Sequence, residues 1–163
     1  MAEEQKNTEE QVLIDPDLKV AVEACSSINT TICGNIIEIG ENRAVLQLKI
    51  TPELIADSEG LAHGGFIYSA GAYVAQAAIN KKNTSIIGSK TSFFAPAKVG
   101  DVLTYEANAK FDNSKKREVL VTAMIRDISV FEATYQVLVT EEHILKMQKS
   151  ELAKYQNKKK VVD

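Results

Sequence analysis

The chain has 163 residues, which is enough for one domain with a sizeable hydrophobic core. Its 22 acidic and 19 basic residues give a net charge of −3, so no strong positive field is available to hold nucleic acid. No apolar run approaches the length of a membrane span, and residues 1–10 are acidic where a secretory signal needs an apolar core. We therefore expect a cytoplasmic protein that binds neither nucleic acid nor membrane.

Composition and charge also suggest how the chain is divided. Residues 1–14 are predicted to form a disordered acidic leader, residues 15–141 a single domain, and residues 142–163 a charged helical or frayed tail. The domain is expected to begin with a short amphipathic helix, because apolar residues follow Asp15-Pro16-Asp17 at helical spacing. These apolar residues are Leu18, Ala21, Val22, Cys25 and Ile28.

The two cysteines, Cys25 and Cys33, are too few for a disulfide framework, and no histidine stands at metal-binding spacing from them. We expect two reduced, mostly buried thiols, no metal site and no resident cofactor.

A β-hairpin is predicted next. Isoleucines at 36, 37 and 39 lead into the turn signal Gly40-Glu41-Asn42. In the following run, Ala44, Leu46, Leu48 and Ile50 alternate with Val45, Gln47 and Lys49, which is typical of a half-buried strand.

A long helix is predicted from Leu61-Ala62-His63-Gly64-Gly65 to about Asn80, and it is unusually rich in alanine. It also contains Gly71, although glycine inside a helix costs about 1 kcal/mol relative to alanine. Such small residues allow close backbone approach, so we expect this helix to pack tightly inside a curved sheet.

Four strands should follow the helix, separated by short turns that make them antiparallel neighbours. The last should bury Phe131, Ala133, Tyr135, Val137 and Val139 on one face. The fold class is therefore α+β, with five to six antiparallel strands around one long helix. The four predicted strands are 86–94, 102–111, 119–126 and 130–140.

At this point the sequence resembles the hotdog superfamily. The resemblance rests on Leu61-Ala62-His63-Gly64-Gly65 opening an alanine-rich helix, followed by a strand, Pro96 and Gly100-Asp101, and it covers about residues 31–140. The most similar branches are the phenylacetate-type acyl-CoA thioesterases and the acyl-CoA-sensing domain of the bacterial fatty-acid regulator. The lysine-, asparagine- and isoleucine-rich composition is also similar to that of virulence-linked hotdog proteins of Campylobacter.

The resemblance implies a ligand and an assembly. Members of the superfamily form dimers, in some cases dimers of dimers, in which two helices lie side by side and the sheets join. They bind acyl thioesters such as acyl-CoA at the dimer interface, in fatty acid metabolism among other pathways. The amide at the position of Gly65 polarises the thioester carbonyl, and Gly64 leaves room for it. The matching histidine, His63, orients the loop and contacts the substrate region.

The helix departs from the thioesterase pattern at one position. Thioesterases of the similar branch carry Asp or Glu seven residues after the second glycine, as nucleophile or general base, whereas this chain has Ala72. Gly65, Ser69, Ala72 and Gln76 share one helical face and are the expected substrate-binding residues. The leading hypothesis is therefore an acyl-CoA-binding hotdog dimer with little or no turnover.

Three other functions stay open. An active acyl-CoA thioesterase could use Asp57, which stands where the family often has Asn, with His63 or Gln76 assisting. A hotdog dehydratase ranks lower, because the Asp-His signature expected before His63 is missing. A dimer that serves only as an interaction module would have a collapsed channel. Phe93 and Phe94, on the strand after the helix, are read as core residues, one of which could line an acyl channel.

Overall fold

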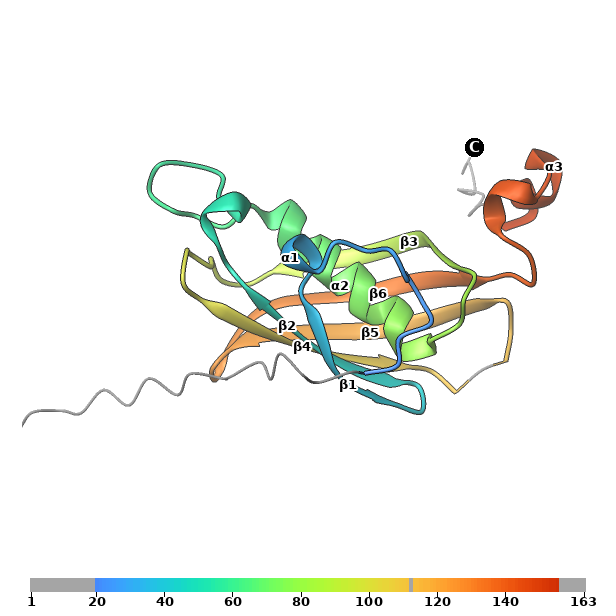
Figure 1. The fold of residues 1–163 in the computed structure, drawn as a ribbon, viewed down its shortest axis with the longest axis horizontal. Coiled ribbons are helices and arrows are strands. Elements are labelled where there is room, and N and C mark those ends of the chain that lie inside the picture. Colours follow the sequence, from blue (N-terminus) through green and yellow to red (C-terminus); the bar gives the residue numbers. More distant parts are fainter. Residues whose placement is uncertain (1–19, 112, 156–163) are drawn as a thin grey trace, which may run out of the picture.

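The computed structural model describes residues 20–111 and 113–155 of the chain. Six antiparallel strands form one curved sheet in the order β1-β2-β4-β5-β6-β3, and the helix α2, Gly64–Ile79, crosses its concave face (Figure 1). The chain therefore has a hotdog fold, as the sequence predicts. The strands are β1 Asn35–Gly40, β2 Arg43–Lys49, β3 Thr84–Phe93, β4 Val102–Ala109, β5 Lys116–Ile125 and β6 Ile128–Val139.

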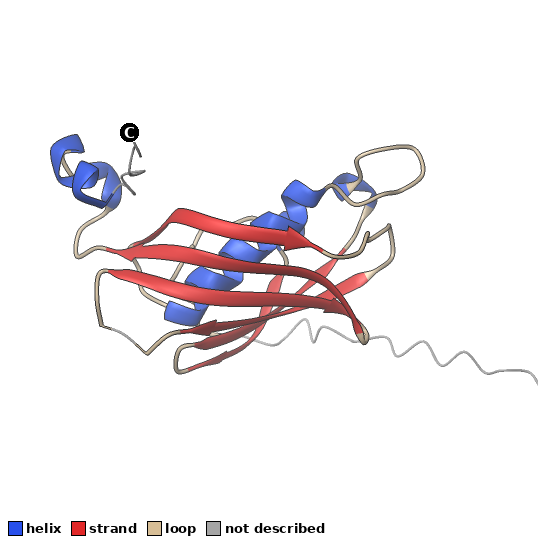
Figure 2. Ribbon diagram, turned by 180° about the vertical axis from the view of Figure 1, so that it is seen from behind, coloured by secondary structure: helices blue, strands red, loops and turns tan. Residues whose placement is uncertain are grey.

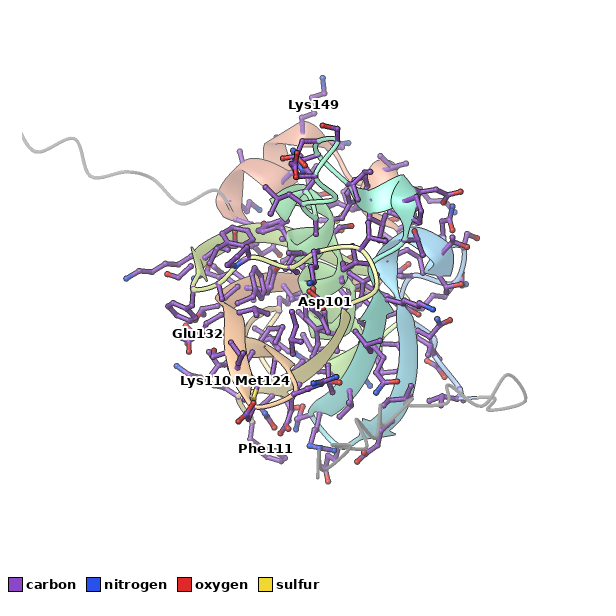
Figure 3. All side chains as sticks on the ribbon, turned by 90° about the vertical axis from the view of Figure 1, so that its left-hand side faces the viewer. Asp101, Lys110, Phe111, Met124, Glu132 and Lys149 are labelled. Atoms are coloured by element: carbon purple, nitrogen blue, oxygen red, sulfur yellow. The ribbon has the colours of Figure 1, made fainter. Side chains whose placement is uncertain are left out.

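The predicted strands are confirmed, with small shifts at their ends. β1 and β2 form the expected hairpin, and β4, β5 and β6 follow as antiparallel neighbours. The view from behind shows the strands lying across one side of α2, with one end of the helix extending past the edge of the sheet (Figure 2). In Figure 3, which looks along the sheet, Met124 and Glu132 point away from α2. The residues that alternate with them along β5 and β6 face the helix and fill the space between it and the sheet.

β2 is more buried than its alternating sequence predicts. Val45 and Gln47, on the face away from α2, are both buried. Val45 pairs with Glu38 of β1 and Glu106 of β4, and Arg43 lies on the same face of β2 and forms ion pairs with both glutamates. This charged cluster lies over Val45 and shields it from water.

α2 is held to the sheet by two buried tyrosines. The hydroxyl of Tyr105 on β4 donates to the carbonyl oxygen of Ile67 at 3.0 Å, and the hydroxyl of Tyr135 on β6 donates to that of Tyr68 at 2.7 Å. Gly71 lies one turn further on, where a Cβ atom would stand 2.6 Å from the Tyr135 hydroxyl oxygen. The close approach expected for this helix is therefore real, and it depends on a residue without a side chain.

The helix predicted from residue 15 to about residue 28 is wrong wherever the structure describes it. Residues 20–29 are irregular, and the first helix is the short α1, Thr30–Cys33. Cys25 has φ 53°, which no right-handed helix allows. The segment instead lies over α2, where Asn80 receives the amides of Glu23 and Ala24 at its side-chain oxygen. The predicted leader, residues 1–14, lies outside the described residues.

Beyond β6, the chain leaves the sheet. It forms the short turns η2 (Ile144–Lys146), α3 (Lys149–Leu152) and η3 (Ala153–Tyr155), which stand apart from the sheet in Figures 1 and 2. Leu145 is 87% exposed. The domain boundary at 141 stays a prediction, and residues 156–163 lie outside the described part.

Candidate functional site

The amino-terminal end of α2 is set in place by the loop before it. The loop closes through a bridge between Ile55 and Ala62, and the amide of His63 donates to the carbonyl of Leu54 at 2.9 Å. A second bridge joins Leu61 to Lys98. The first helical residue, Gly64, is therefore fixed next to the segment that follows β3.

Gly65 carries the donor that the resemblance assigns to a thioester carbonyl. In the structure, its N–H donates to Nδ1 of His63 at 2.9 Å, so His63 is the helix N-cap. A Cβ atom at Gly65 would lie 2.8 Å from that nitrogen, so only glycine leaves room for the imidazole. Sequence reasoning placed both residues at the site but missed their contact with each other.

An open, mostly apolar hollow of about 290 Å³ lies beside this helix end. Phe93 and Phe94 line it and are 52% and 58% exposed, so the interpretation of these residues as core is wrong. Gly64 lines the hollow and Gly65 does not, and a Cβ atom at Gly64 would touch the Phe93 ring at 3.3 Å. The hollow is lined by Ala62, Gly64, Ile67, Phe93, Phe94, Ala95, Pro96 and Ala97.

The predicted polar stripe along α2 is partly engaged within the chain. Ser69 Oγ lies 3.3 Å from Cys33 Sγ of α1, and the Gln76 side-chain amide donates to the carbonyl and hydroxyl oxygens of Thr84, each at 3.1 Å. Ala72 lies between these two positions and is half-buried. None of the three lines the hollow, so their role in substrate binding stays a prediction.

Asp57 lies in the exposed loop before the helix. Its Oδ1 accepts the amides of Glu59 at 3.0 Å and Leu61 at 3.2 Å, and the Gly60 amide donates to its carbonyl. These contacts make Asp57 the residue that shapes the turn. Its catalytic role stays a prediction.

Thr91 is a candidate that the sequence did not reveal. It pairs with the buried Ala133, so its side chain is on the face of β3 that meets α2. On that same face Ser89 contacts the Tyr68 hydroxyl at 2.8 Å, and Phe93 contacts Gly64. Thr91 Oγ1 is buried and, among the described residues, has no hydrogen-bond partner. Thr91 does not line the hollow, so this unpaired hydroxyl marks a polar atom enclosed between the two contacts.

The buried titratable groups near α2 favour their neutral forms. Burial, with a smaller contribution from Cys33, raises the pKa of the Cys25 thiol to about 11. Burial also raises the pKa of Tyr105 well above its ordinary value, with a smaller contribution from Tyr135. These groups therefore serve structure and hydrogen bonding rather than acid–base chemistry. In residues 20–111 and 113–155, no cluster of three or more His, Cys, Asp or Glu side chains could hold a metal ion.

The comparison with solved structures decides the family. Cj0977, a sigma28-regulated virulence protein from Campylobacter jejuni, is 50% identical to this chain and superimposes with a TM-score of 0.76. The match covers 77% of this chain and 89% of Cj0977. This chain belongs to the same family of hotdog-fold proteins as Cj0977. The predicted resemblance to a virulence-linked Campylobacter hotdog protein is thereby confirmed.

Two further relatives extend the comparison. The uncharacterized protein PH1136 from Pyrococcus horikoshii is 30% identical, with a TM-score of 0.74, over 77% of this chain and 97% of that protein. Methylthioribose-1-phosphate isomerase from Aquifex aeolicus is 36% identical over 108 residues, 66% of this chain. The match spans only 24% of the isomerase, so the activity of that whole protein is not assigned to this chain. The sequence matches no family model.

More distant structures share the fold alone. A hypothetical thioesterase from Streptococcus pneumoniae, solved with coenzyme A, is 18% identical with a TM-score of 0.61, over 67% of this chain and 87% of that one. The PaaI protein of E. coli, from the phenylacetic acid degradation operon, is 18% identical with a TM-score of 0.58, over 64% of this chain and 81% of that one.

Among the described residues, no helix is long and apolar enough to cross a bilayer.

Proposed function

We propose that this chain binds an acyl thioester such as an acyl-CoA, as a homodimer, with little or no hydrolysis. The observation that carries the proposal is the helix end at Gly64 and Gly65, which opens beside an apolar hollow lined by Phe93 and Phe94. A helix amino terminus offers free N–H groups and a partial positive charge to a carbonyl oxygen. The adjacent apolar surface suits an acyl chain.

The solved structures support coenzyme A as the carrier. One neighbour was solved with coenzyme A and another, from Streptococcus mutans, with acetyl-CoA. Both share the hotdog fold with this chain at 17–18% identity. The ligand class is therefore inferred from the fold together with the helix end, and the acyl group is left to experiment.

Weak or absent turnover is inferred from Ala72. A methyl group can act neither as nucleophile nor as general base, whereas the similar thioesterases have a carboxylate at this position. The nearest polar stripe residues, Ser69 and Gln76, already have partners in their own chain. A site with a carbonyl donor and no base can bind a thioester without attacking it.

The homodimer is inferred from β3. This strand of ten residues pairs with β6 on one side and, within the described part of the chain, with nothing on the other. A long unpaired edge strand is a template for a second sheet. Ala72 is half-buried on α2 between Ser69, which contacts α1, and Gln76, which contacts β3. The resemblance implies that the partner's helix lies beside α2. Light scattering should give twice the chain mass of 17.9 kDa, and a dimer of dimers would give four times that mass.

The decisive experiment measures binding and turnover together on a panel of acyl-CoAs. We expect micromolar binding by calorimetry and no release of free thiol. Ala72→Asp should introduce thiol release, because it places a carboxylate on the Gly65 face of α2. Ala72→Asn is the matched control, with the same shape and no base. Absence of binding to every acyl-CoA would refute the proposed function.

Fast thiol release by the unmodified protein would instead favour an active thioesterase. Asp57→Asn then tests the candidate base, since the amide keeps an oxygen to accept the Glu59 and Leu61 amides. A fall in turnover of a hundredfold or so, within the usual range for losing a general base, would assign catalysis to Asp57. Unchanged turnover would exclude it.

A further inference from the structure

Among the described residues, the Gly65 N–H that is the proposed carbonyl donor makes one hydrogen bond, to a side chain of the same loop. His63 Nδ1 accepts the Gly65 N–H at 2.9 Å. A ring nitrogen that accepts a hydrogen bond cannot itself carry a proton, so this contact requires the form of the ring with Nδ1 unprotonated. The contact satisfies one of the amides that a helix leaves unpaired at its first turn.

This contact uses the N–H that the proposed function assigns to the ligand. A thioester carbonyl needs the same donor. The ring also lies close against Gly65, because a Cβ atom there would stand 2.8 Å from Nδ1 and 3.0 Å from Cε1. The imidazole therefore occupies the space that glycine leaves open. His63 and a carbonyl oxygen cannot both stand there.

The imidazole is free to leave. His63 is exposed, and its ring meets Phe66 edge-on with 6.0 Å between ring centres. Within the described part of the chain, Nε2 makes no hydrogen bond, so a rotation of the side chain breaks one hydrogen bond, that to Gly65, and changes the contact with Phe66. His63 N remains bonded to Leu54, which keeps the backbone in place as the ring moves.

We propose that His63 is a displaceable cap on the Gly65 amide, and that a thioester carbonyl replaces it on binding. The inference rests on the proposed function and extends it to selectivity. A ligand with a carbonyl at this point must exchange one acceptor for another, whereas free coenzyme A has no such carbonyl and leaves the cap in place. His63 is thus a positioning residue that lowers the preference for acyl-CoA over CoA.

The test detects the cap directly. An N–H···N hydrogen bond transmits a scalar coupling between its two nitrogens, measurable by NMR in uniformly ¹⁵N-labelled full-length protein. We expect a coupling between Gly65 N and His63 Nδ1 in the free protein. It should persist with saturating CoA and disappear with saturating octanoyl-CoA.

Each outcome has one meaning. If octanoyl-CoA binds and the coupling persists, the cap proposal is wrong while the proposed function stands. If no acyl-CoA of the panel binds, the proposed function fails and the cap proposal with it. If the coupling disappears with CoA as well, the ring is moved by something other than the carbonyl, and the proposal is again wrong.

Two variants provide an independent measurement. His63→Asn keeps an acceptor for the Gly65 N–H, whereas His63→Ala removes it. We expect His63→Ala to raise the ratio of octanoyl-CoA to CoA affinity by about fivefold, the factor that corresponds to a lost N-cap. His63→Asn should leave the ratio near that of the unmodified protein. Equal ratios in all three proteins, each folded by circular dichroism, would overturn the proposal.

Discussion

The two ends of α2 differ in how firmly their backbone groups are held by the rest of the chain. At the carboxyl end, Asn80 has a left-handed backbone, φ 51°, and its side chain makes three hydrogen bonds to residues 21–24. At the amino end, the one described residue that covers the Gly65 amide is an exposed histidine, and the neighbouring hollow is lined by half-exposed phenylalanines. One helix therefore has a closed end that fixes it in the fold and an open end available to a ligand.

The contrast teaches which residues serve stability and which serve function. The backbone of α2 is tied to β4 and β6 at Ile67 and Tyr68, by hydrogen bonds from Tyr105 and Tyr135. Its carboxyl end is tied to the segment before α1 by Asn80. Substitutions there should lower stability before they affect binding. Substitutions at the amino end should change binding at a small cost in stability.

Gly71→Val should have the largest effect on stability, because Gly71 makes the tightest contact between α2 and the sheet. A Cβ atom would lie 2.6 Å from the Tyr135 hydroxyl and 2.9 Å from Phe131 Cε1. We expect a loss of about 3 kcal/mol in the free energy of unfolding, measured by urea denaturation. The matched control is Gly40→Ala, whose Cβ would meet no atom closer than 4.0 Å and should change stability by less than about 0.5 kcal/mol.

Asn80→Ala should come next, at about 2 kcal/mol, since it removes both the hydrogen bonds and a side chain that tolerates the left-handed backbone. Asn80→Gly separates the two causes, because glycine adopts this conformation freely and loses only the bonds. The glycine variant should therefore be the more stable of the two in thermal unfolding. If both variants lose the same stability, the backbone conformation contributes nothing.

Phe93→Ala tests the open end. Phe93 lines the hollow and also packs edge-on against Phe131, with 5.3 Å between ring centres. We expect affinity for octanoyl-CoA to fall about tenfold, or about 1.4 kcal/mol, while affinity for CoA is unchanged. Leu120→Ala is the control, an exposed apolar residue on the opposite face of the sheet. An equal loss of affinity for CoA would mean that Phe93 supports the whole site rather than the acyl chain.

The sheet and the buried length of α2 were easier to predict from the sequence than the open amino end of the helix. The alternation in residues 44–50 and the alanine-rich run after Gly64 reflect period-2 and helical burial, which local patterns report well. The helix predicted near residues 15–28 failed because its apolar spacing, from Val22 to Ile28, serves packing on α2 in an irregular conformation. The backbone partner there is Asn80, more than fifty residues away, which no local pattern shows.

At the amino end of α2, the sequence predicted which residues form the candidate site but not the contacts that they make. The motif His63-Gly64-Gly65 identified the helix start, yet the cap depends on a side-chain rotamer that sequence does not specify. One signal was available: a side chain at the N-cap position, here His63, can accept a hydrogen bond from the amide two residues later, here that of Gly65. The exposure of Phe93 and Phe94 was also missed, because the sequence does not show that β3 is an edge strand or that it ends at Phe93.

The smallest expected effect lies on the outer face of the sheet, away from both ends of α2. A hydrogen bond from Asn108, and then the neighbouring Arg43, lowers the pKa of Glu106 below its ordinary value. A carboxylate whose pKa is lowered by folding stabilises the native state above its unfolded pKa, and this stabilisation disappears as pH falls through the folded value. Glu106→Gln should therefore lose about 0.5 kcal/mol at pH 7, since the side chain is nearly half exposed.

The same variant shows whether the effect is electrostatic. The difference in unfolding free energy between Glu106→Gln and the unmodified protein should shrink towards zero as pH falls below about 4, and also in molar salt. Acyl-CoA affinity should not change at any pH, because the cluster lies across the sheet from α2. A difference that keeps its size in acid would instead come from the methylene groups of Glu106 covering Val45, which is packing and not charge.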